Sequence, residues 1–259
     1  MDAIILGDGP LGLAIAAALV ERGDGVRLVG RPPGGGDRHD PDALAEAGAE
    51  VAIEASRGDA VAGNVEALLG AGIRRLVIAT TAWERDRARV EGLLADHRAA
   101  AVVAPNLSLG VALFGRLVVA AVGLYGRVPA FDPYIVEWHR RGKADRPSGT
   151  ARALAARIVD AHPRVRRLAE PGALGPPPAD TLEVIGVRAG ANPGSHLVGF
   201  DAPGETIELR CTARDRTAYA AGALAAADWL RARSRAPGIH PFDAVVDDLL
   251  RGSEVAMAV

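Results

Sequence analysis

The sequence predicts an α/β protein made of two parts, and two patterns along the chain predict it. Over the first hundred residues, short apolar runs typical of strands alternate with helical patterns. Such alternation indicates a parallel sheet with helices on both faces. After residue 106 the pattern changes to strand-like runs joined by turns rich in Gly and Pro. These runs indicate a second, open and mixed sheet, which we expect to be largely antiparallel.

The first part should contain five strands and four helices. Apolar runs predict strands at 3–6, 26–29, 51–54, 75–78 and 101–104. Helical patterns predict helices at 11–22, 61–69 and 84–97. Asp40, ahead of Pro41, is placed as the N-cap of a further short helix. Segment 30–37 is dominated by Gly and Pro and should have no regular structure.

The second part begins with a long apolar helix at 109–124 and a strand at 134–138. Ser148 is placed to cap a helix at 148–160. Strands are expected at 182–188, 196–200 and 205–211, and the proline-rich segment 168–178 predicts a surface loop. Helices at 217–232 and 242–250 complete the chain.

Bulk composition excludes several classes of protein. The net charge is −2 and the isoelectric point is near 6.3, so no basic field indicates nucleic acid. Cys211 is the only cysteine, which excludes an intramolecular disulfide and fits a reducing compartment. The longest apolar stretch, 107–125, contains Arg116 and reads as a buried helix rather than a membrane span. Because the first residues also lack a targeting signal, we expect a cytoplasmic protein.

A glycine-rich motif follows the first predicted strand. The motif, G-x-G-x-x-G, consists of Gly7, Asp8, Gly9, Pro10, Leu11 and Gly12. At the start of a helix it can hold the pyrophosphate of a dinucleotide, as in Rossmann folds; the alternative is a glycine-rich turn that binds nothing. The acid that usually binds the ribose is missing, since Gly30 and Arg31 follow the second strand. Arg31 suits the 2′-phosphate of NADPH better than the free hydroxyl of NADH, unless it is only a solvated loop residue.

Two further segments follow predicted strands and should lie at the same edge of the parallel sheet. They are Ala79, Thr80 and Thr81 after 75–78, and Ala104, Pro105, Asn106 and Leu107 after 101–104. Ligands of open α/β sheets bind at the carboxyl ends of the strands. Small residues there would let the backbone approach a nicotinamide, although ordinary strand-to-helix turns have the same appearance.

The loop after strand 134–138 contains Lys143, the only lysine in a chain where 29 of the 30 Lys and Arg residues are arginine. Lysine is a compact charge that can release a proton, so arginine does not replace it everywhere. His139, four residues earlier, can donate a proton near neutral pH, and Arg140 adds a further positive charge.

The same loop leads into the helix expected from Ser148. Ser148, Gly149 and Thr150 offer free backbone N–H groups and the positive end of a helix dipole to an anion. The loop and the helix start therefore predict a pocket for a substrate with carboxylates, supplied with one proton donor. No Cys, His or Asp cluster has the spacing of metal ligands, so we expect no metal.

This loop resembles the signature of the dihydrodipicolinate reductase family, E-x-H-H-x-x-K-x-D-x-P-S-G-T-A. The matching residues are Glu137, His139, Lys143, Asp145, Pro147, Ser148, Gly149, Thr150 and Ala151. Segment 104–111 is similar to the family's A-x-N-[FL]-S-x-G-V, and 80–81 to its G-T-T-G turn. Segments 187–190 and 194–196 resemble its V-R-A-G and G-E-H pieces, so the resemblance covers nearly the whole chain.

The resemblance implies two domains and a reaction. A dinucleotide-binding domain would comprise 1–106 and 216–259, and a substrate-binding and oligomerisation domain 107–215, whose sheets build a homotetramer. The reaction would be the reduction of a cyclic unsaturated dicarboxylate by NADPH, in preference to NADH, in diaminopimelate and lysine biosynthesis. His139 would donate the proton, Lys143 would assist and hold one carboxylate, and the N–H groups of Gly149 and Thr150 would hold the other. The cofactor would be lined by residues 7–12, 79–81 and 104–107, with Arg31 and Arg216.

The chain departs from the family pattern at four places. Arg140 stands where the family has a second His, Ala79 and Ala82 replace the two glycines of the G-T-T-G turn, and Gly30 replaces an acid. The glycine-rich loop is also one residue shorter. These departures leave two alternatives: a relative that reduces another cyclic imine or imino acid, and a non-catalytic nucleotide sensor. Intact His139 and Lys143 argue against the sensor, which needs no proton donor.

Overall fold

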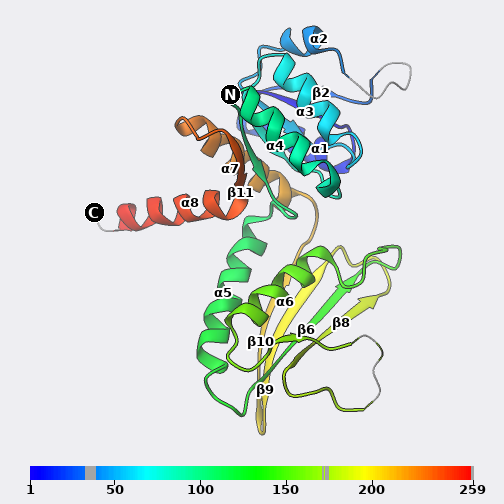
Figure 1. Cartoon of the computed structure of the whole chain (residues 1–259), viewed down its shortest axis with the longest axis vertical. Helices are drawn as coiled ribbons and strands as arrows, with labels where there is room; N and C mark the ends of the chain where they lie inside the picture. The colour runs from blue at the N-terminus through cyan, green and yellow to red at the C-terminus, as the bar shows by residue number, and fades with distance from the viewer. Residues whose placement is uncertain (33–38, 171, 173–174, 258–259) are drawn as a thin grey trace. The chain divides into compact units, whose positions relative to one another are not determined.

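The computed structural model describes residues 1–32, 39–170, 172 and 175–257, so part of the predicted irregular segment 30–37 lies outside the described residues. The chain divides into two compact units. Unit 1 comprises Met1–Leu109 and Arg216–Val259, and unit 2 comprises Gly110–Asp215. Figure 1 shows both units, with the helices α1 to α8 and some of the strands labelled.

Unit 1 is built on a six-stranded parallel sheet, as the alternating pattern predicts. Its strands are β1 (Asp2–Leu6), β2 (Gly25–Val29), β3 (Val51–Glu54), β4 (Arg75–Ile78), β5 (Ala100–Val103) and β11 (Gly238–Pro241). The strand order is β11-β5-β4-β3-β1-β2, and every neighbouring pair is parallel. All six strands therefore end at one edge, where the loops expected to bind a ligand begin.

Helices cover both faces of this sheet. They are α1 (Pro10–Arg22), α2 (Pro41–Ala45), α3 (Val61–Gly70), η2 (Glu84–Asp86), α4 (Arg87–Asp96), α7 (Thr217–Ala232) and α8 (Phe242–Met257). Asp40 caps α2 as predicted, since its side chain accepts a hydrogen bond from the N–H of Asp42 and Pro41 follows it. Helix α7 contacts β3, β4 and β5 and packs against α1. A chain segment from beyond unit 2 thus completes unit 1.

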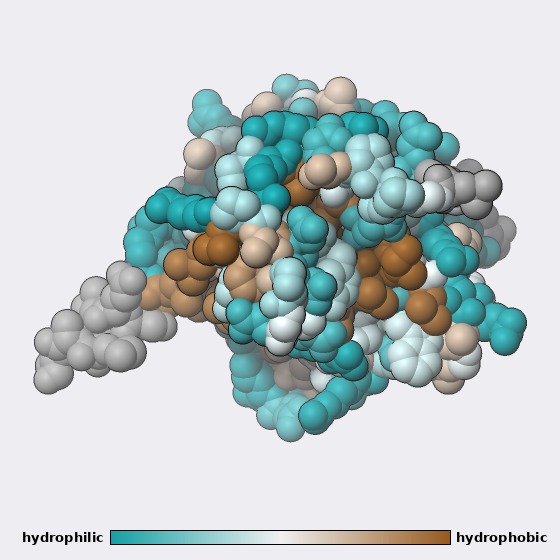
Figure 2. Space-filling view, turned by 90° about the horizontal axis from the view of Figure 1, so that it is seen from below, coloured by the Kyte–Doolittle hydropathy of each residue, from teal (hydrophilic) through white to brown (hydrophobic). Residues whose placement is uncertain are grey.

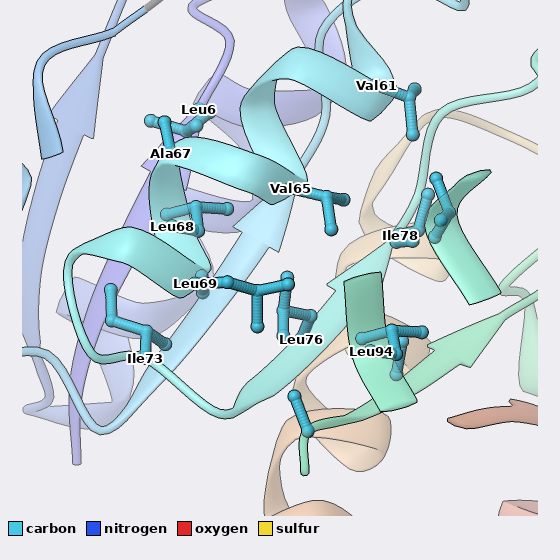
Figure 3. Packing of buried hydrophobic residues seen from close by; sticks show 14 of the residues in the cluster. Leu6, Val61, Val65, Ala67, Leu68, Leu69, Ile73, Leu76, Ile78 and Leu94 are labelled. Carbon is cyan, nitrogen blue, oxygen red and sulfur yellow. The ribbon is translucent and has the colours of Figure 1, made fainter. Parts of the chain in front are cut away.

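The core on the other face joins α3 and α4 to the sheet. Leu6, Leu76 and Ile78 of the strands pack against Val65 and Leu68 of α3, and Leu94 of α4 belongs to the same cluster. Figure 3 shows these side chains converging between the helices and the strands. Each is fully buried, and burial of such a side chain contributes about 1.5–3 kcal/mol. This packing fixes the strands whose ends carry the candidate cofactor loops.

Unit 2 is built on a five-stranded mixed sheet. Its strands are β6 (Asp132–His139), β7 (Arg167–Leu168), β8 (Thr181–Arg188), β9 (Ser195–Ala202) and β10 (Glu205–Thr212), and its helices are α5 (Leu109–Tyr125) and α6 (Gly149–Ala161). The order is β10-β9-β6-β8-β7. The predicted mixed sheet is confirmed: β10–β9 and β6–β9 are antiparallel, as expected for most of the sheet, whereas β6–β8 and β7–β8 are parallel. The chain between β6 and β8 passes through α6, and a parallel pair requires a crossover of that kind.

Helix α5 is less buried than its apolar sequence predicts. Phe114, Val118 and Val122 are buried in the core of unit 2, whereas Leu117 and Leu124 remain 61% and 70% exposed. On the face shown in Figure 2, hydrophobic residues gather in separate patches among hydrophilic ones. Among the described residues, no helix has the length and hydrophobicity needed to cross a membrane.

Two strands escaped prediction. Strand β11 was missed because it contains Gly238 and Pro241, which are uncommon within strands. It forms an edge of the parallel sheet, beside β5. Proline is tolerated at such an edge because the outer side of the strand needs no ladder hydrogen bond. Strand β7 has only two residues, which is too short to leave a pattern. The α/β fold class with a parallel and a mixed sheet is otherwise confirmed.

Candidate functional site

The glycine-rich loop of unit 1 connects β1 to α1. Gly7 has φ +117°, and a Cβ there would lie 2.4 Å from the carbonyl oxygen of Ala55. A Cβ at Gly12 would lie 1.9 Å from the carbonyl oxygen of Gly7, so both positions require glycine. At Gly9, by contrast, no described atom lies within 4 Å of an added Cβ. Gly9 is the N-cap of α1 and provides no side-chain cap, so the first N–H groups of the helix have no side-chain partner there. An anion such as a pyrophosphate could accept from such groups.

The other predicted cofactor residues lie in the loops at the same sheet edge. Ala79, Thr80 and Thr81 directly follow β4, and Ala104 to Leu107 follow β5. Asp8, Pro10 and Arg31 are exposed, Leu11 is half-buried, and Arg216 is exposed at the N-cap of α7. A Cβ at Gly222 of α7 would overlap the carbonyl oxygen of Leu107, at 1.5 Å. Helix α7 therefore supports the loop after β5 directly.

A buried acid that the sequence patterns did not indicate lies at the end of β3. Glu54 is fully buried, and burial raises the pKa of its carboxyl above the ordinary value. Its Oε1 accepts hydrogen bonds from Ser56 and, at 3.0 Å, from the side chain of Asn64. A Cβ at Gly58 would lie 2.2 Å from the carbonyl oxygen of Ala82, so the loops after β3 and β4 are in close contact. This cluster holds the strand ends in place.

The predicted proton donor of unit 2 lies beside a buried carboxylate. Glu137 and His139 end β6 with both side chains buried, and Glu137 Oε2 lies 3.3 Å from His139 Nδ1. Glu137 Oε1 accepts hydrogen bonds from the N–H of Ser148 at 2.9 Å and from Arg188 at 2.7 Å. Burial alone would raise the pKa of Glu137, but these hydrogen bonds and the Arg188 charge lower it overall. The carboxylate is therefore ionised, and its Oε2 attracts a positive charge on His139 across 3.3 Å without a hydrogen bond to Nδ1.

The Nδ1 of His139 is buried beside Glu137, which leaves Nε2 as the nitrogen for proton exchange. Its Nε2 lies near Gly194, where an added Cβ would stand 3.1 Å away. Burial lowers the pKa of His139, and Glu137 opposes the shift while Lys143 and Arg188 add to it. A lowered pKa makes the imidazolium form of His139 a stronger acid, which suits a proton donor. The positive charge of the ring is needed only while an anionic ligand is bound.

Lys143 and the start of α6 are already joined by a carboxylate of the chain itself. Lys143 Nζ lies 2.6 Å from Asp145 Oδ1, and the backbone N–H of Gly149 also favours the ionised Asp145 carboxylate. Burial would raise the pKa of Asp145, but Lys143 and that N–H lower it overall. The ammonium and the first N–H groups of α6 therefore both lie near one carboxylate of the chain, whereas the sequence predicts that they bind two different carboxylates of a ligand.

The remaining predicted residues of this loop differ in accessibility. Arg140 is exposed, and Gly149 and Thr150 are half-buried at the start of α6. Ser148 is buried, and its hydroxyl accepts from the N–H of Ala151 and lies 3.2 Å from Nε2 of His196. Ser148 is thus the N-cap that the sequence predicts, with its hydrogen-bonding groups turned into the protein.

Two residues of this network had no predicted role. Arg188 ends β8 and His196 begins β9, and both contact Glu137, at 2.7 Å and 3.7 Å. Burial, with the neighbouring charges, lowers the pKa of His196 to about 4, so this ring is neutral near pH 7. Only their places in the segments 187–190 and 194–196, which resemble family motifs, could have indicated them.

Glu137, His139 and His196 are also close enough to ligate a metal. Among the residues that the structure describes, their candidate ligand atoms lie within 4.8 Å of one another. Arg188 and Lys143 add two positive charges to the same group, which disfavours a divalent cation there. That no metal binds stays a prediction.

Comparisons with known proteins show the family and the fold of the chain. Residues 110–246 match the family model of the C-terminal part of dihydrodipicolinate reductase. The 4-hydroxy-tetrahydrodipicolinate reductase of Myxococcus xanthus is 36% identical over 203 residues, which cover 76% of this chain and 72% of that protein. The reductase of the same name from Methanococcoides burtonii is 33% identical over 205 residues, covering 78% and 75%. The same fold is found in the solved structure of dipicolinate-bound dihydrodipicolinate reductase from Paenisporosarcina sp. TG-14, with a TM-score of 0.69. The match covers 93% of this chain and 97% of that chain, at 17% sequence identity.

Proposed function

Because the chain belongs to the dihydrodipicolinate reductase family, we propose that it reduces 4-hydroxy-tetrahydrodipicolinate to tetrahydrodipicolinate in diaminopimelate and lysine biosynthesis. It is an oxidoreductase that uses NAD(P)H, which supplies the hydride when bound. The observation that carries the proposal is the loop of unit 2 in which a histidine paired with a buried carboxylate lies beside a cationic carboxylate site. Such a loop has the groups needed to bind a dicarboxylate and protonate it.

His139 is the proposed proton donor. Its Nδ1 is buried beside Glu137, so Nε2 is the nitrogen that gives its proton to the substrate. A bound dicarboxylate brings negative charge near the ring, which raises the pKa of His139 and keeps it protonated in the complex. The acid is thus charged when substrate is present and is regenerated from solvent after product leaves.

Lys143 and the start of α6 are the proposed carboxylate site. One substrate carboxylate takes the place of Asp145 on Lys143, and the N–H groups of Gly149 and Thr150 bind the other. Arg140, exposed beside His139, can bind a carboxylate through two N–H groups. Ser148 supports this site from within, since it caps α6 and holds Glu137.

Unit 1 is the proposed cofactor half. The open space at Gly9 receives the pyrophosphate, and the loops after β4 and β5 line the nicotinamide. NADPH is preferred over NADH because Arg31 follows β2 and can pair with a 2′-phosphate. In this proposal unit 1 is the dinucleotide-binding domain, and unit 2 binds substrate.

A second candidate is the reduction of a different cyclic imine or imino acid. Arg140 favours it, since a planar guanidinium replaces the family's second His directly after the proton donor. Arginine is bulkier than histidine and binds carboxylates in pairs of hydrogen bonds, so it would select a substrate of different shape.

One assay separates the candidates. The product of dihydrodipicolinate synthase is supplied with NADPH or NADH, and oxidation of the nicotinamide is followed by absorbance. We expect turnover with both, and a higher kcat/KM with NADPH. If neither cofactor supports turnover, the leading function is wrong, and a panel of other cyclic imines tests the second. A higher kcat/KM with NADH would reject the role of Arg31.

The protein is also proposed to form a homotetramer in the cytoplasm. The exposed face of the unit 2 sheet is the proposed contact surface between its subunits. Trp138 of β6 and its strand partner Val187 of β8 are 45% and 38% exposed on the face opposite the core, with Ile185 49% exposed beside them. Adjacent exposed apolar residues on a sheet favour contact with another copy. Light scattering of the wild type and Ile185→Glu tests this: a tetramer that the substitution dissociates is expected, and a wild-type monomer would contradict it.

A further inference from the structure

The end of β2 and the glycine-rich loop of unit 1 are in direct contact. The N–H of Gly7 donates a hydrogen bond to the carbonyl oxygen of Val29 at 2.8 Å. Gly30 follows Val29, and a Cβ added at Gly30 would lie 2.7 Å from Oδ2 of Asp8. The Asp8 carboxylate therefore fills the space that a side chain at position 30 would enter.

This space has a known use in dinucleotide-binding sheets. The residue after the second strand is generally an acid whose carboxylate accepts hydrogen bonds from the ribose hydroxyls of NAD. Glycine at position 30 removes that acid, but it also makes room for Asp8. A carboxylate thus stands at the expected place, although it comes from the glycine-rich loop instead of the strand.

We propose that Asp8 binds the adenosine ribose hydroxyls of NADH and takes the place of the missing acid. The inference rests on the proposed function, because it requires that unit 1 binds a dinucleotide. Arg31, one residue beyond Gly30, binds the 2′-phosphate of NADPH, and Asp8 repels it. The two cofactors thus depend on different residues, so the chain accepts NADH while Arg31 favours NADPH.

The test measures binding of each cofactor separately from turnover. Dissociation constants of NADH and NADPH are determined from nicotinamide fluorescence for the full chain and for Asp8→Asn, which keeps the shape and removes the charge. We expect the Kd of NADH to rise about tenfold, as for one lost charge-assisted hydrogen bond, and the Kd of NADPH to stay the same or fall. Asp96→Asn, at an exposed acid that ends α4, should change neither value.

Each outcome decides between the proposals. An equal rise in both Kd values, or no change in either, overturns the role of Asp8 and leaves the proposed function standing. Wild-type protein that binds neither cofactor overturns both proposals. Arg31→Ala supplies the reverse comparison, since it should weaken NADPH about tenfold and leave NADH unchanged. Thermal unfolding of each variant verifies that the fold is kept.

Discussion

The candidate sites of the two units consist of different chemical groups: charged side chains in unit 2, and mainly backbone N–H groups in unit 1. In unit 2 the site consists of charged side chains that hold one another: Glu137 binds Arg188 and lies beside His139, and Lys143 binds Asp145. In unit 1 the site consists mainly of backbone N–H groups and of the space that glycines leave.

The departures from the family pattern follow this division. Gly30, Ala79, Ala82 and the shortened loop all fall in unit 1, and Arg140 of unit 2 is an exposed residue outside the buried network. Removing one partner of a buried ion pair leaves an uncompensated charge and costs about 3–5 kcal/mol. A backbone N–H, by contrast, persists under most substitutions. A site formed by paired charged side chains therefore tolerates few substitutions. A site formed by backbone N–H groups tolerates more of them.

The largest effect is expected from the proton donor. His139→Gln keeps a polar side chain beside Glu137 but removes the transferable proton, so kcat should fall by about 10²–10⁴-fold. Steady-state kinetics with saturating cofactor measures the loss. His97→Gln, a half-buried histidine of unit 1 that ends α4, is the control and should keep kcat. If His139→Gln kept kcat within a few-fold of wild type, another group would be the donor.

Lys143→Arg tests whether the site needs an ammonium or any cation. The broader guanidinium cannot take the position of an Nζ that lies 2.6 Å from Asp145, so kcat should fall at least about tenfold while the fold is kept. Kinetics and thermal unfolding are measured together. Arg141→Lys, an exposed neighbour in the same loop, makes the reverse change and should have little effect. Near-normal kcat for Lys143→Arg would show that positive charge alone suffices.

The pH dependence tests the electrostatics of unit 2 without a mutation. The active form of a proton donor is protonated, and burial lowers the pKa of His139 below its ordinary 6.5 in the free protein. Hence kcat/KM, which reports the free enzyme, should fall as pH rises through a pKa below that value. In the complex the substrate carboxylates favour the imidazolium, so the fall in kcat should come at higher pH. Equal pKa values in both profiles would contradict the proposed carboxylate site near His139.

Asp145→Asn tests the displacement of an internal carboxylate. Substrate must replace Asp145 on Lys143 and on the N–H of Gly149, so the variant should lower KM by about two- to fivefold, the range for a partly exposed ion pair. Asp180→Asn removes the exposed carboxylate that pairs with Arg167 elsewhere in unit 2, and it should leave KM unchanged. A rise in KM for Asp145→Asn would mean that Asp145 orients Lys143 for the substrate instead of competing with it.

The same division separates what the sequence could predict from what it could not. Apolar periodicity located the main strands and helices, and caps such as Asp40 and Ser148 were local enough to identify. The network around Glu137 was not local, since Arg188 lies 51 residues further along the chain. Burial of a polar side chain depends on tertiary packing. The residue pattern within β3 therefore could not show that Glu54 is buried. Motif resemblance predicted the residues of the site, but their partners required the fold.

The smallest effect is expected in unit 1, at a turn where alanine occupies a backbone conformation that favours glycine. Ala82 has φ +62°, a left-handed conformation that favours glycine, and it is exposed, so no packing compensates for the strain. Ala82→Gly relieves that strain but loosens the unfolded chain, and the free energy of unfolding should rise by about 0.5–1 kcal/mol. Denaturant unfolding measures the change, and Ala17→Gly, at an exposed position within α1, should instead destabilise by about 1 kcal/mol. Because the N–H groups of the proposed nicotinamide site keep their places, kcat should stay the same. A loss of stability in Ala82→Gly would show that the turn does not need glycine, and that the change to alanine in unit 1 has no cost in stability.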